Sequence, residues 1–227
     1  MIWARKIYRK VWIKMDNTNI IEVLKSTPLF GGMDEGEIKS VIDGAGAVKR
    51  SFRKGSFILH SGDKPQSFGI LLSGSAMIER DEVWGDRSII SGIEVGQLFA
   101  EVYACTGEPM TVSVCAKTDC EVMFLRPDMI IKESGLLTQR LLRITARKNL
   151  KLNEKISVIT PRTIRGRVMA YLSLMSAKSG SKRITSDFSR QQLADYLCVD
   201  RSALSAELGK MKRDGVIDYH LNVFELK

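Results

Sequence analysis

Short apolar runs separated by glycine-containing turns dominate the chain between residues 47 and 125. They predict β-strands at residues 57–60, 68–72, 75–79, 88–90, 111–116 and 120–125. Many short strands punctuated by turn residues at near-regular intervals are typical of an antiparallel β-sandwich or jelly roll. Two short helices are expected before it, at residues 19–29 and 34–43. The second begins with Asp34 followed three residues later by Glu37, which is the pattern of a capping box.

Apolar residues recur at helical spacing between residues 137 and 159, with Lys148 at a place where another apolar residue is expected. A helix with one narrow apolar stripe between two compact segments buries that stripe most economically against the same helix of a second chain. We therefore expect a homodimer whose interface contains Leu137, Leu141, Ile144, Leu152 and Ile156. Leu136, Leu142 and Leu150 widen the apolar arc, so packing of this helix on the chain's own sandwich is the alternative.

The last third of the chain predicts two helices joined by a tight turn. Ser189 followed by Gln192 forms a capping box that begins a helix ending near Leu197. After a three-residue turn, Asp200 caps a second helix, in which the residues expected to be buried are Leu204, Leu208 and Met211. A helix at residues 164–175 and a strand at 183–185 precede this pair, and strands at 216–219 and 223–226 follow it as a wing.

Such a helix pair places its second helix in the major groove of DNA. Arg201, Ser202 and Ser205 begin the exposed face of that helix, and these side-chain types can hydrogen-bond to base edges. Ser189, Arg190 and Lys210 are expected to lie toward phosphates, where they would fix the register without reading sequence.

Charge is distributed unevenly along this chain of net charge +9. Residues 16–134 carry 12 basic and 18 acidic side chains, residues 135–160 carry six and one, and residues 161–227 carry 12 and seven. An acidic N-terminal body joined to a basic C-terminal part is typical of a sensor coupled to a nucleic-acid binder.

We therefore expect four segments: a basic extension at residues 1–15, a sensor sandwich at 16–134, a dimerisation helix at 135–160 and a winged helix-turn-helix domain at 161–227. The extension fits either a short membrane-surface helix or a disordered or non-native stretch ahead of Met15. The cysteines at 105, 115, 120 and 198 include no CxxC pair, and no stretch is organised as a secretion signal. These features indicate a reduced, cytoplasmic protein.

Six motifs follow one another along residues 20–227. They are PLF at 28–30, GSFILHSGD at 55–63, FGILLSGSAMI at 68–78, GQLFAE at 96–101, CEV at 120–122 and RQQLADYLCVDRSALSAELGKMKRDGVI at 190–217. With them the chain resembles the CRP/FNR family of bacterial transcription regulators. The resemblance implies an α+β fold with a cyclic-nucleotide-binding-like jelly roll, a long dimerisation helix and a C-terminal winged helix-turn-helix. It also implies a homodimer that binds a two-fold-symmetric operator in double-stranded DNA, with RNA polymerase as a further partner.

Two positions depart from the family pattern in the helix pair. Cys198 stands in the turn where such motifs often have Gly, so the backbone there either avoids positive φ or tolerates some strain. Members that respond to cyclic AMP carry a Glu and a second Arg in the recognition helix, where this chain has Ser202 and Ala206. We therefore expect a different operator sequence.

The resemblance also locates a candidate effector site. Cyclic-nucleotide binders of the family use Gly-Glu at the ribose and Arg-Ser or Arg-Thr at the phosphate, and the matching residues here are Ala100, Glu101, Met110 and Thr111. A buried phosphodiester without its guanidinium partner would be an unpaired charge, so we expect no cyclic AMP. With Leu152 and Asn153 from the long helix, these residues would form a pocket for an unidentified small effector. A filled core without ligand is the alternative, and no cofactor is identified.

Other interpretations are weaker on the residues present. A redox switch would use Cys105, Cys115 or Cys120. An iron-sulfur centre is not expected, because this chain lacks the N-terminal cysteine cluster of the family members that carry one. A cupin-like metalloenzyme needs several converging His, and His60 and His220 fall in different predicted domains, so we expect neither a metal site nor catalysis. A cyclic-nucleotide-responsive regulator and a module tethered to a membrane by residues 1–14 remain as alternatives, although no membrane partner is expected.

Overall fold

The computed structural model describes residues 17–81 and 87–227, so the predicted extension at residues 1–15 lies outside the described residues. The chain divides into two compact units, Met1–Thr145 and Ala146–Lys227. This division falls inside helix α5 (Gly135–Ile159), which the sequence pattern predicts as a segment of its own.

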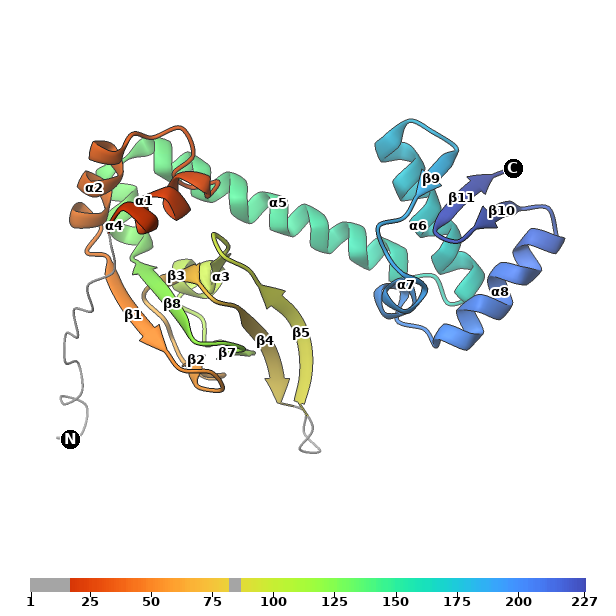
Figure 1. Cartoon of the computed structure of the whole chain (residues 1–227), viewed down its shortest axis with the longest axis horizontal. Helices are drawn as coiled ribbons and strands as arrows, with labels where there is room; N and C mark the ends of the chain where they lie inside the picture. Colours follow the sequence, from red (N-terminus) through yellow and green to blue (C-terminus); the bar gives the residue numbers. More distant parts are fainter. Residues whose placement is uncertain (1–16, 82–86) are drawn as a thin grey trace. The chain divides into compact units, whose positions relative to one another are not determined.

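The first unit is built on two antiparallel four-stranded sheets (Figure 1). One has the order β1-β8-β3-β6 and consists of β1 (Val48–Phe52), β3 (Phe68–Ser73), β6 (Leu98–Phe99) and β8 (Cys120–Leu125). The other has the order β2-β7-β4-β5 and consists of β2 (Phe57–Leu59), β4 (Ala76–Asp81), β5 (Arg87–Ile93) and β7 (Ser113–Ala116). The predicted β-sandwich is thereby confirmed, with β1 and β6 as strands that the sequence pattern did not single out.

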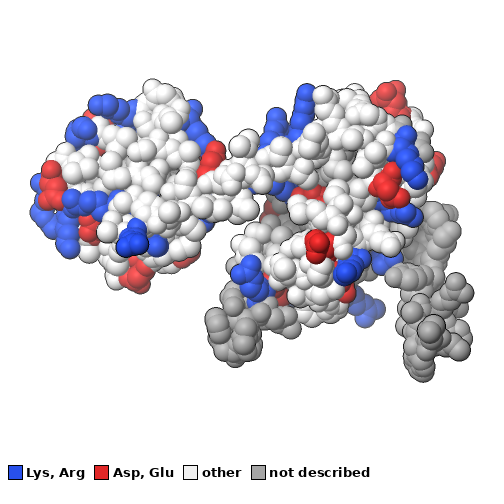
Figure 2. Space-filling model, turned by 180° about the vertical axis from the view of Figure 1, so that it is seen from behind, with Lys and Arg blue, Asp and Glu red and all other residues white. Residues whose placement is uncertain are grey.

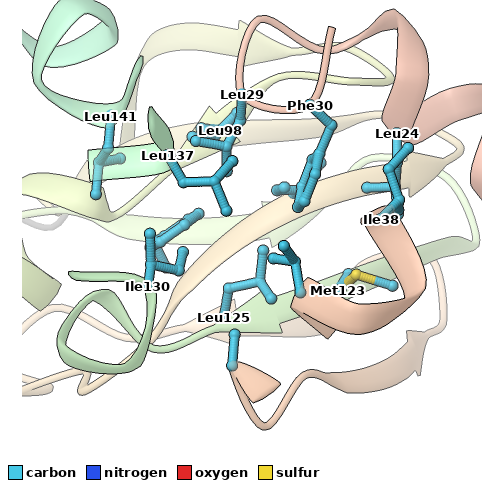
Figure 3. Packing of buried hydrophobic residues seen from close by; sticks show 14 of the residues in the cluster. Leu24, Leu29, Phe30, Ile38, Leu98, Met123, Leu125, Ile130, Leu137 and Leu141 are labelled. Atoms are coloured by element: carbon cyan, nitrogen blue, oxygen red, sulfur yellow. The ribbon is translucent and has the colours of Figure 1, made fainter. Parts of the chain in front are cut away.

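Strand β8 is buried on both faces because the sandwich has helices on one side. It pairs with β1 from Val48 opposite Phe124 to Phe52 opposite Cys120. Cys120, Val122 and Phe124 pack in the core between the two sheets. The alternate residues Met123 and Leu125 pack instead against the helical layer, as their positions in Figure 3 show. The sandwich therefore has two separate cores.

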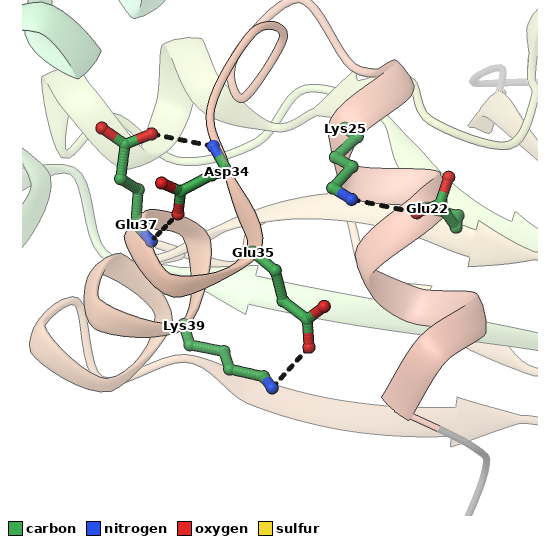
Figure 4. A network of polar contacts seen from close by, with 6 residues as sticks. All are labelled: Glu22, Lys25, Asp34, Glu35, Glu37 and Lys39. Carbon is green, nitrogen blue, oxygen red and sulfur yellow. Dashed lines mark hydrogen bonds and ion pairs between the residues drawn. The ribbon is translucent and has the colours of Figure 1, made fainter.

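The helical layer consists of α1 (Asn17–Ser26), α2 (Glu35–Gly44), α4 (Pro127–Glu133) and the start of α5 (Figure 1). The apolar side chains of these helices and of the turn after α1 fill the core of Figure 3, and those buried there include Leu24, Leu29, Phe30, Ile38 and Ile130. The predicted capping box of α2 is confirmed: the Asp34 carboxylate accepts a hydrogen bond from the Glu37 amide at 2.8 Å, and the Glu37 carboxylate accepts one from the Asp34 amide at 2.8 Å (Figure 4).

The first part of α5 packs on its own sandwich. Leu137 and Leu141 are 0% and 5% exposed in the core of the first unit, and Ile144 is partly buried against that core. The Arg140 guanidinium donates a hydrogen bond to the Leu29 carbonyl at 3.1 Å. The predicted dimer interface is therefore corrected at Leu137 and Leu141, because residues of the same chain already cover both side chains.

The second unit contains the end of α5 and a small α+β domain. Its remaining elements are α6 (Ile164–Ser179), β9 (Arg183–Thr185), α7 (Arg190–Leu197), α8 (Arg201–Arg213), β10 (Ile217–His220) and β11 (Val223–Leu226). The three strands form one antiparallel sheet in the order β10-β11-β9. One core joins the helices to this sheet, and its fully buried residues include Ala194, Leu197, Leu204, Leu208 and Met211. The predicted helix pair and wing are confirmed.

Candidate nucleic-acid interface and effector site

Helix α7 begins as its sequence predicts. The Ser189 hydroxyl oxygen accepts a hydrogen bond from the Gln192 amide at 3.3 Å, and the Gln192 side chain accepts one from the Ser189 amide at 2.9 Å. This box satisfies two amide groups that the first turn of a helix would otherwise leave without partners. Ser189 is exposed, but its hydroxyl oxygen is engaged in the capping hydrogen bond from the Gln192 amide.

The turn between α7 and α8 has the strained backbone, with positive φ at Cys198, rather than the alternative that avoids positive φ. Cys198 has φ 53° and ψ 50°, the left-handed conformation in which glycine is usual. Arg167 of α6 donates hydrogen bonds to the carbonyls of Leu197 and Cys198 at 3.0 and 2.9 Å. Sequence reasoning missed Arg167, because a basic residue inside a helix gives no local sign that it reaches a turn 30 residues away.

Helix α8 is capped by Asp200, as predicted. The Asp200 carboxylate accepts hydrogen bonds from the amides of Ser202 and Ala203 at 2.8 and 2.9 Å, and the Ser202 hydroxyl donates to the same oxygen. The Ser202 hydroxyl and the surrounding amides hold the pKa of Asp200 below its ordinary value. The carboxylate therefore stays ionised at the start of α8.

The three predicted base-reading residues share the start of α8. Arg201, Ser202 and Ser205 are all exposed, and the Ser205 hydroxyl donates to the Arg201 carbonyl at 3.0 Å. Each serine thus donates its proton within the helix and keeps acceptor capacity on its oxygen. Their exposure is compatible with contact to base edges, because the opposite face of α8 is fixed in the core through Leu204 and Leu208.

Basic residues also gather at the end of α8. Its last turn contains Lys210, Lys212 and Arg213, all exposed, and Lys212 forms an ion pair with Asp218 of the wing at 2.5 Å. Figure 2 shows Lys and Arg side chains clustered at the outer edge of the C-terminal unit, with fewer acidic ones among them. This charge suits a polyanionic partner.

Arg190, which is predicted to contact phosphate, also contacts the wing of its own domain. Its guanidinium lies 5.3 Å from the ring centroid of Tyr219 and 5.5 Å from that of Phe224, and it donates a hydrogen bond to the Leu221 carbonyl at 2.9 Å. Burial lowers the pKa of Arg190, and the nearby Arg201 lowers it further. Arg190 therefore braces the wing close to the start of α8.

The predicted effector residues of the first unit are largely built into its core. Ala100 has φ 60° and precedes the short helix α3 (Glu101–Thr106), whose first residue, Glu101, is buried. Met110 is 3% exposed in the core between the sheets. Thr111 is exposed, and its hydroxyl forms a 2.8 Å hydrogen bond with that of Tyr103. The structure thus brings α3 and residue 111 together and places the Met110 side chain in the core.

The other two predicted effector residues, Leu152 and Asn153, are exposed on α5 in the second unit. The Asn153 side chain donates to that of Asn149 at 2.9 Å. A hollow of about 300 Å³ is found elsewhere, over β1 and β8 and the turns beside them, with Arg53, Asp119 and Glu121 among its lining residues. None of the predicted effector residues lines this hollow.

The remaining sequence predictions concern a redox switch at the cysteines and a metal site. Cys120 is buried, and burial is the main cause that raises the pKa of its thiol, which disfavours the reactive thiolate. Cys105 is exposed. No cluster of three or more His, Cys, Asp or Glu side chains suited to a metal ion is found in residues 17–81 and 87–227. Within the same ranges, no helix is long and apolar enough to cross a membrane.

Two family models match the two units. Residues 49–133 match the cyclic nucleotide-binding domain, and residues 166–226 match the Crp-like helix-turn-helix domain. The chain is 21% identical over 204 residues to a CRP-like cAMP-activated global transcriptional regulator of Mycobacterium tuberculosis, covering 86% of this chain and 90% of that one. It is 23% identical over 182 residues to the transcriptional activator protein FnrL of Cereibacter sphaeroides, covering 74% and 71%.

Solved structures share the fold. The catabolite activator protein of Thermus thermophilus is similar with a TM-score of 0.50 and 20% identity, over 88% of this chain and 94% of that one. CprK in complex with OCPA is similar with a TM-score of 0.59 and 13% identity, over 84% and 88%. With a sandwich, a long helix and a capped helix-turn-helix in the same order, and with both family models matched, the chain belongs to the CRP/FNR family of transcription regulators and carries their DNA-binding helix-turn-helix.

Proposed function

We propose that the protein is a homodimeric regulator that recognises a two-fold-symmetric site in double-stranded DNA through α8 and responds to a signal other than a cyclic nucleotide. The observation that carries the first part is the start of α8, where Arg201, Ser202 and Ser205 are exposed while Leu204 and Leu208 fix the helix in the core. Arginine can bind guanine with two hydrogen bonds, and the serine oxygens keep the capacity to accept hydrogen bonds from bases.

The end of α5 supports the homodimer. Leu152 and Ile156, one turn apart on the same face, are 58% and 49% exposed on this helix. Large apolar side chains grouped on one helix favour an apolar partner, and a second copy of the same helix offers the matching surface in a two-fold arrangement. The proposed interface therefore keeps Leu152 and Ile156 from the sequence prediction, together with Ile144, which is only partly buried. Leu150 points to the opposite face of the helix and lies outside this interface.

The site at Met110 supports a signal other than a cyclic nucleotide. A phosphodiester at this position would meet a buried thioether, which provides neither charge nor strong hydrogen bonds. The Mycobacterium tuberculosis relative is described as cAMP-activated, so the two proteins would differ in their signal. A small apolar effector that displaces Met110, with RNA polymerase as the downstream partner, is the arrangement that we propose.

The test begins with duplexes selected from a random-sequence library by the full chain. We expect enrichment of a two-fold-symmetric sequence, and we expect Arg201→Ala to weaken binding to it by about tenfold or more, the effect of losing one good base contact. Arg53→Ala removes the same charge from an exposed position of the first unit and serves as the control. Equal affinities for Arg201→Ala and Arg53→Ala would show that α8 does not read the site.

A further inference from the structure

Three consecutive carbonyls at the end of α7 accept hydrogen bonds from cationic side chains of two other helices. Lys155 of α5 donates to the Tyr196 carbonyl, and its ammonium lies 3.8 Å from the centroid of the Tyr196 ring. Arg167 of α6 donates to the next two carbonyls, those of Leu197 and Cys198. These donors reach the turn that connects the two helices of the DNA-binding motif.

The end of a helix is a place where such donors have a large effect. Its last carbonyls have no partner within the helix, and they form the negative end of the helix dipole. A glycine in the left-handed conformation commonly ends a helix without strain, but here Cys198 occupies that position with φ 53°. The cations of Lys155 and Arg167 provide partners for the carbonyls of Tyr196, Leu197 and Cys198, where the chain leaves α7.

Lys155 differs from Arg167 in the element that carries it. It lies in the part of α5 that belongs to the second unit, where Val158 is fully buried in the core and Glu154 forms a 2.6 Å ion pair with Lys178 of α6. The Lys155 ammonium lies against the Tyr196 ring and carbonyl, and this burial lowers the pKa of Lys155. Any rotation of the end of α5 about its axis would withdraw this ammonium from the turn.

We propose that Lys155 is a positioning residue for DNA recognition, which couples the end of α5 to the helix-turn-helix and thereby sets the direction of α8. The inference rests on the proposed DNA binding. Lys155 touches no base in this account; it acts through the Tyr196 carbonyl and ring on the turn that precedes Arg201. A change in α5, the helix that we propose to dimerise, would reach the recognition helix by this contact.

The experiment compares the full-length wild-type chain with Lys155→Met, which keeps the aliphatic stem, and with Lys155→Arg, which keeps a cationic donor. Lys151→Met, at an exposed position one turn earlier, is the matched control for loss of charge. Each protein is titrated with the duplex selected by the wild-type chain and with a shuffled duplex of the same composition, at several salt concentrations. The ratio of the two affinities is the readout, because a purely stabilising contact would leave it unchanged in folded protein.

We expect Lys155→Met to lower the ratio by about tenfold, the loss that one misplaced base contact produces, with little change in binding to the shuffled duplex. Lys155→Arg should restore most of the ratio, and Lys151→Met should leave it unchanged. If Lys155→Met fails to fold, Lys155→Gln, which keeps a neutral donor, is measured in its place with the same expectation of a lowered ratio.

Two outcomes would overturn the inference. An unchanged ratio in a folded variant would show that Lys155 only stabilises the domain. An equal loss of affinity for both duplexes, with a salt dependence reduced by about one ion, would show that Lys155 contacts phosphate directly. If the wild-type chain enriches no duplex, the proposed DNA binding itself is overturned and the inference falls with it, so the two failures are distinguishable.

Discussion

The two units differ in the exposure of the residues that are predicted to bind their ligands. At the start of α8, polar side chains are exposed and a buried apolar face supports them. In the sandwich, the position that matches a phosphate-binding arginine is Met110, which is 3% exposed and part of the core. Under the proposed function, the DNA-binding unit keeps the chemistry that its fold implies, whereas the sandwich keeps the fold and binds a different class of ligand. Fold and ligand are separate properties of such a domain.

The largest expected effect tests this contrast by placing an arginine at residue 110. Met110→Arg would bury an unpaired charge between the two sheets, and we expect it to lower the free energy of unfolding of the first unit by about 3 to 5 kcal/mol. Urea denaturation followed by circular dichroism measures this loss. Thr111→Arg, at the exposed neighbouring position, should cost far less. If Met110→Arg is tolerated and the variant binds cyclic AMP, the site is an open pocket and the contrast is wrong.

A second effect separates the two parts of α5. Leu137→Ala should lower the free energy of unfolding by about 2 to 5 kcal/mol, because it leaves a cavity in the core of the first unit. Leu152→Ala should leave the stability of a single chain nearly unchanged but weaken dimerisation by about tenfold, since burial of one leucine contributes at least about 1.5 kcal/mol. Analytical ultracentrifugation together with urea denaturation distinguishes the two variants. A dimer that survives Leu152→Ala and dissociates with Leu137→Ala would contradict the corrected interface.

The smallest effect concerns acid pH and the cap of α8. Hydrogen bonds hold the pKa of Asp200 below its unfolded value, so its stabilising contribution is present above the unfolded pKa and is lost as pH falls through the folded pKa. Asp200→Ala should therefore slightly destabilise the second unit at neutral pH, and the difference from wild type should vanish in acid. Thermal denaturation at a series of pH values measures this. A difference that persists at the lowest pH would assign the effect to something other than the carboxylate.

The sequence predicts the second unit better than the first because its signals are local. Capping at Ser189 and Asp200, and burial of Leu204 and Leu208 one turn apart, depend on residues within one or two helical turns. The same logic found most strands of the sandwich from their apolar runs. It missed α3 and α4, which are six and seven residues long and too short to show a period.

Contacts between distant residues account for the remaining differences. Spacing along α5 shows which residues share a face, but it does not show what covers them, so Leu137 and Leu141 were predicted at an interface and lie in a core. Arg190, Arg167 and Lys155 have long side chains that reach partners about 30 or more residues away. Such contacts depend on the tertiary fold and leave no periodic pattern in the sequence.

The exposed lysine in the apolar stripe of α5 has a consequence for the solution behaviour of the proposed dimer. Two-fold symmetry would bring Lys148 of each copy to the same helical seam, where like charges repel. Added salt screens this repulsion and favours the dimer, whereas it weakens binding to the phosphates of DNA. The two dependences have opposite signs, so a salt series would separate the strength of the dimer from the strength of its binding to DNA.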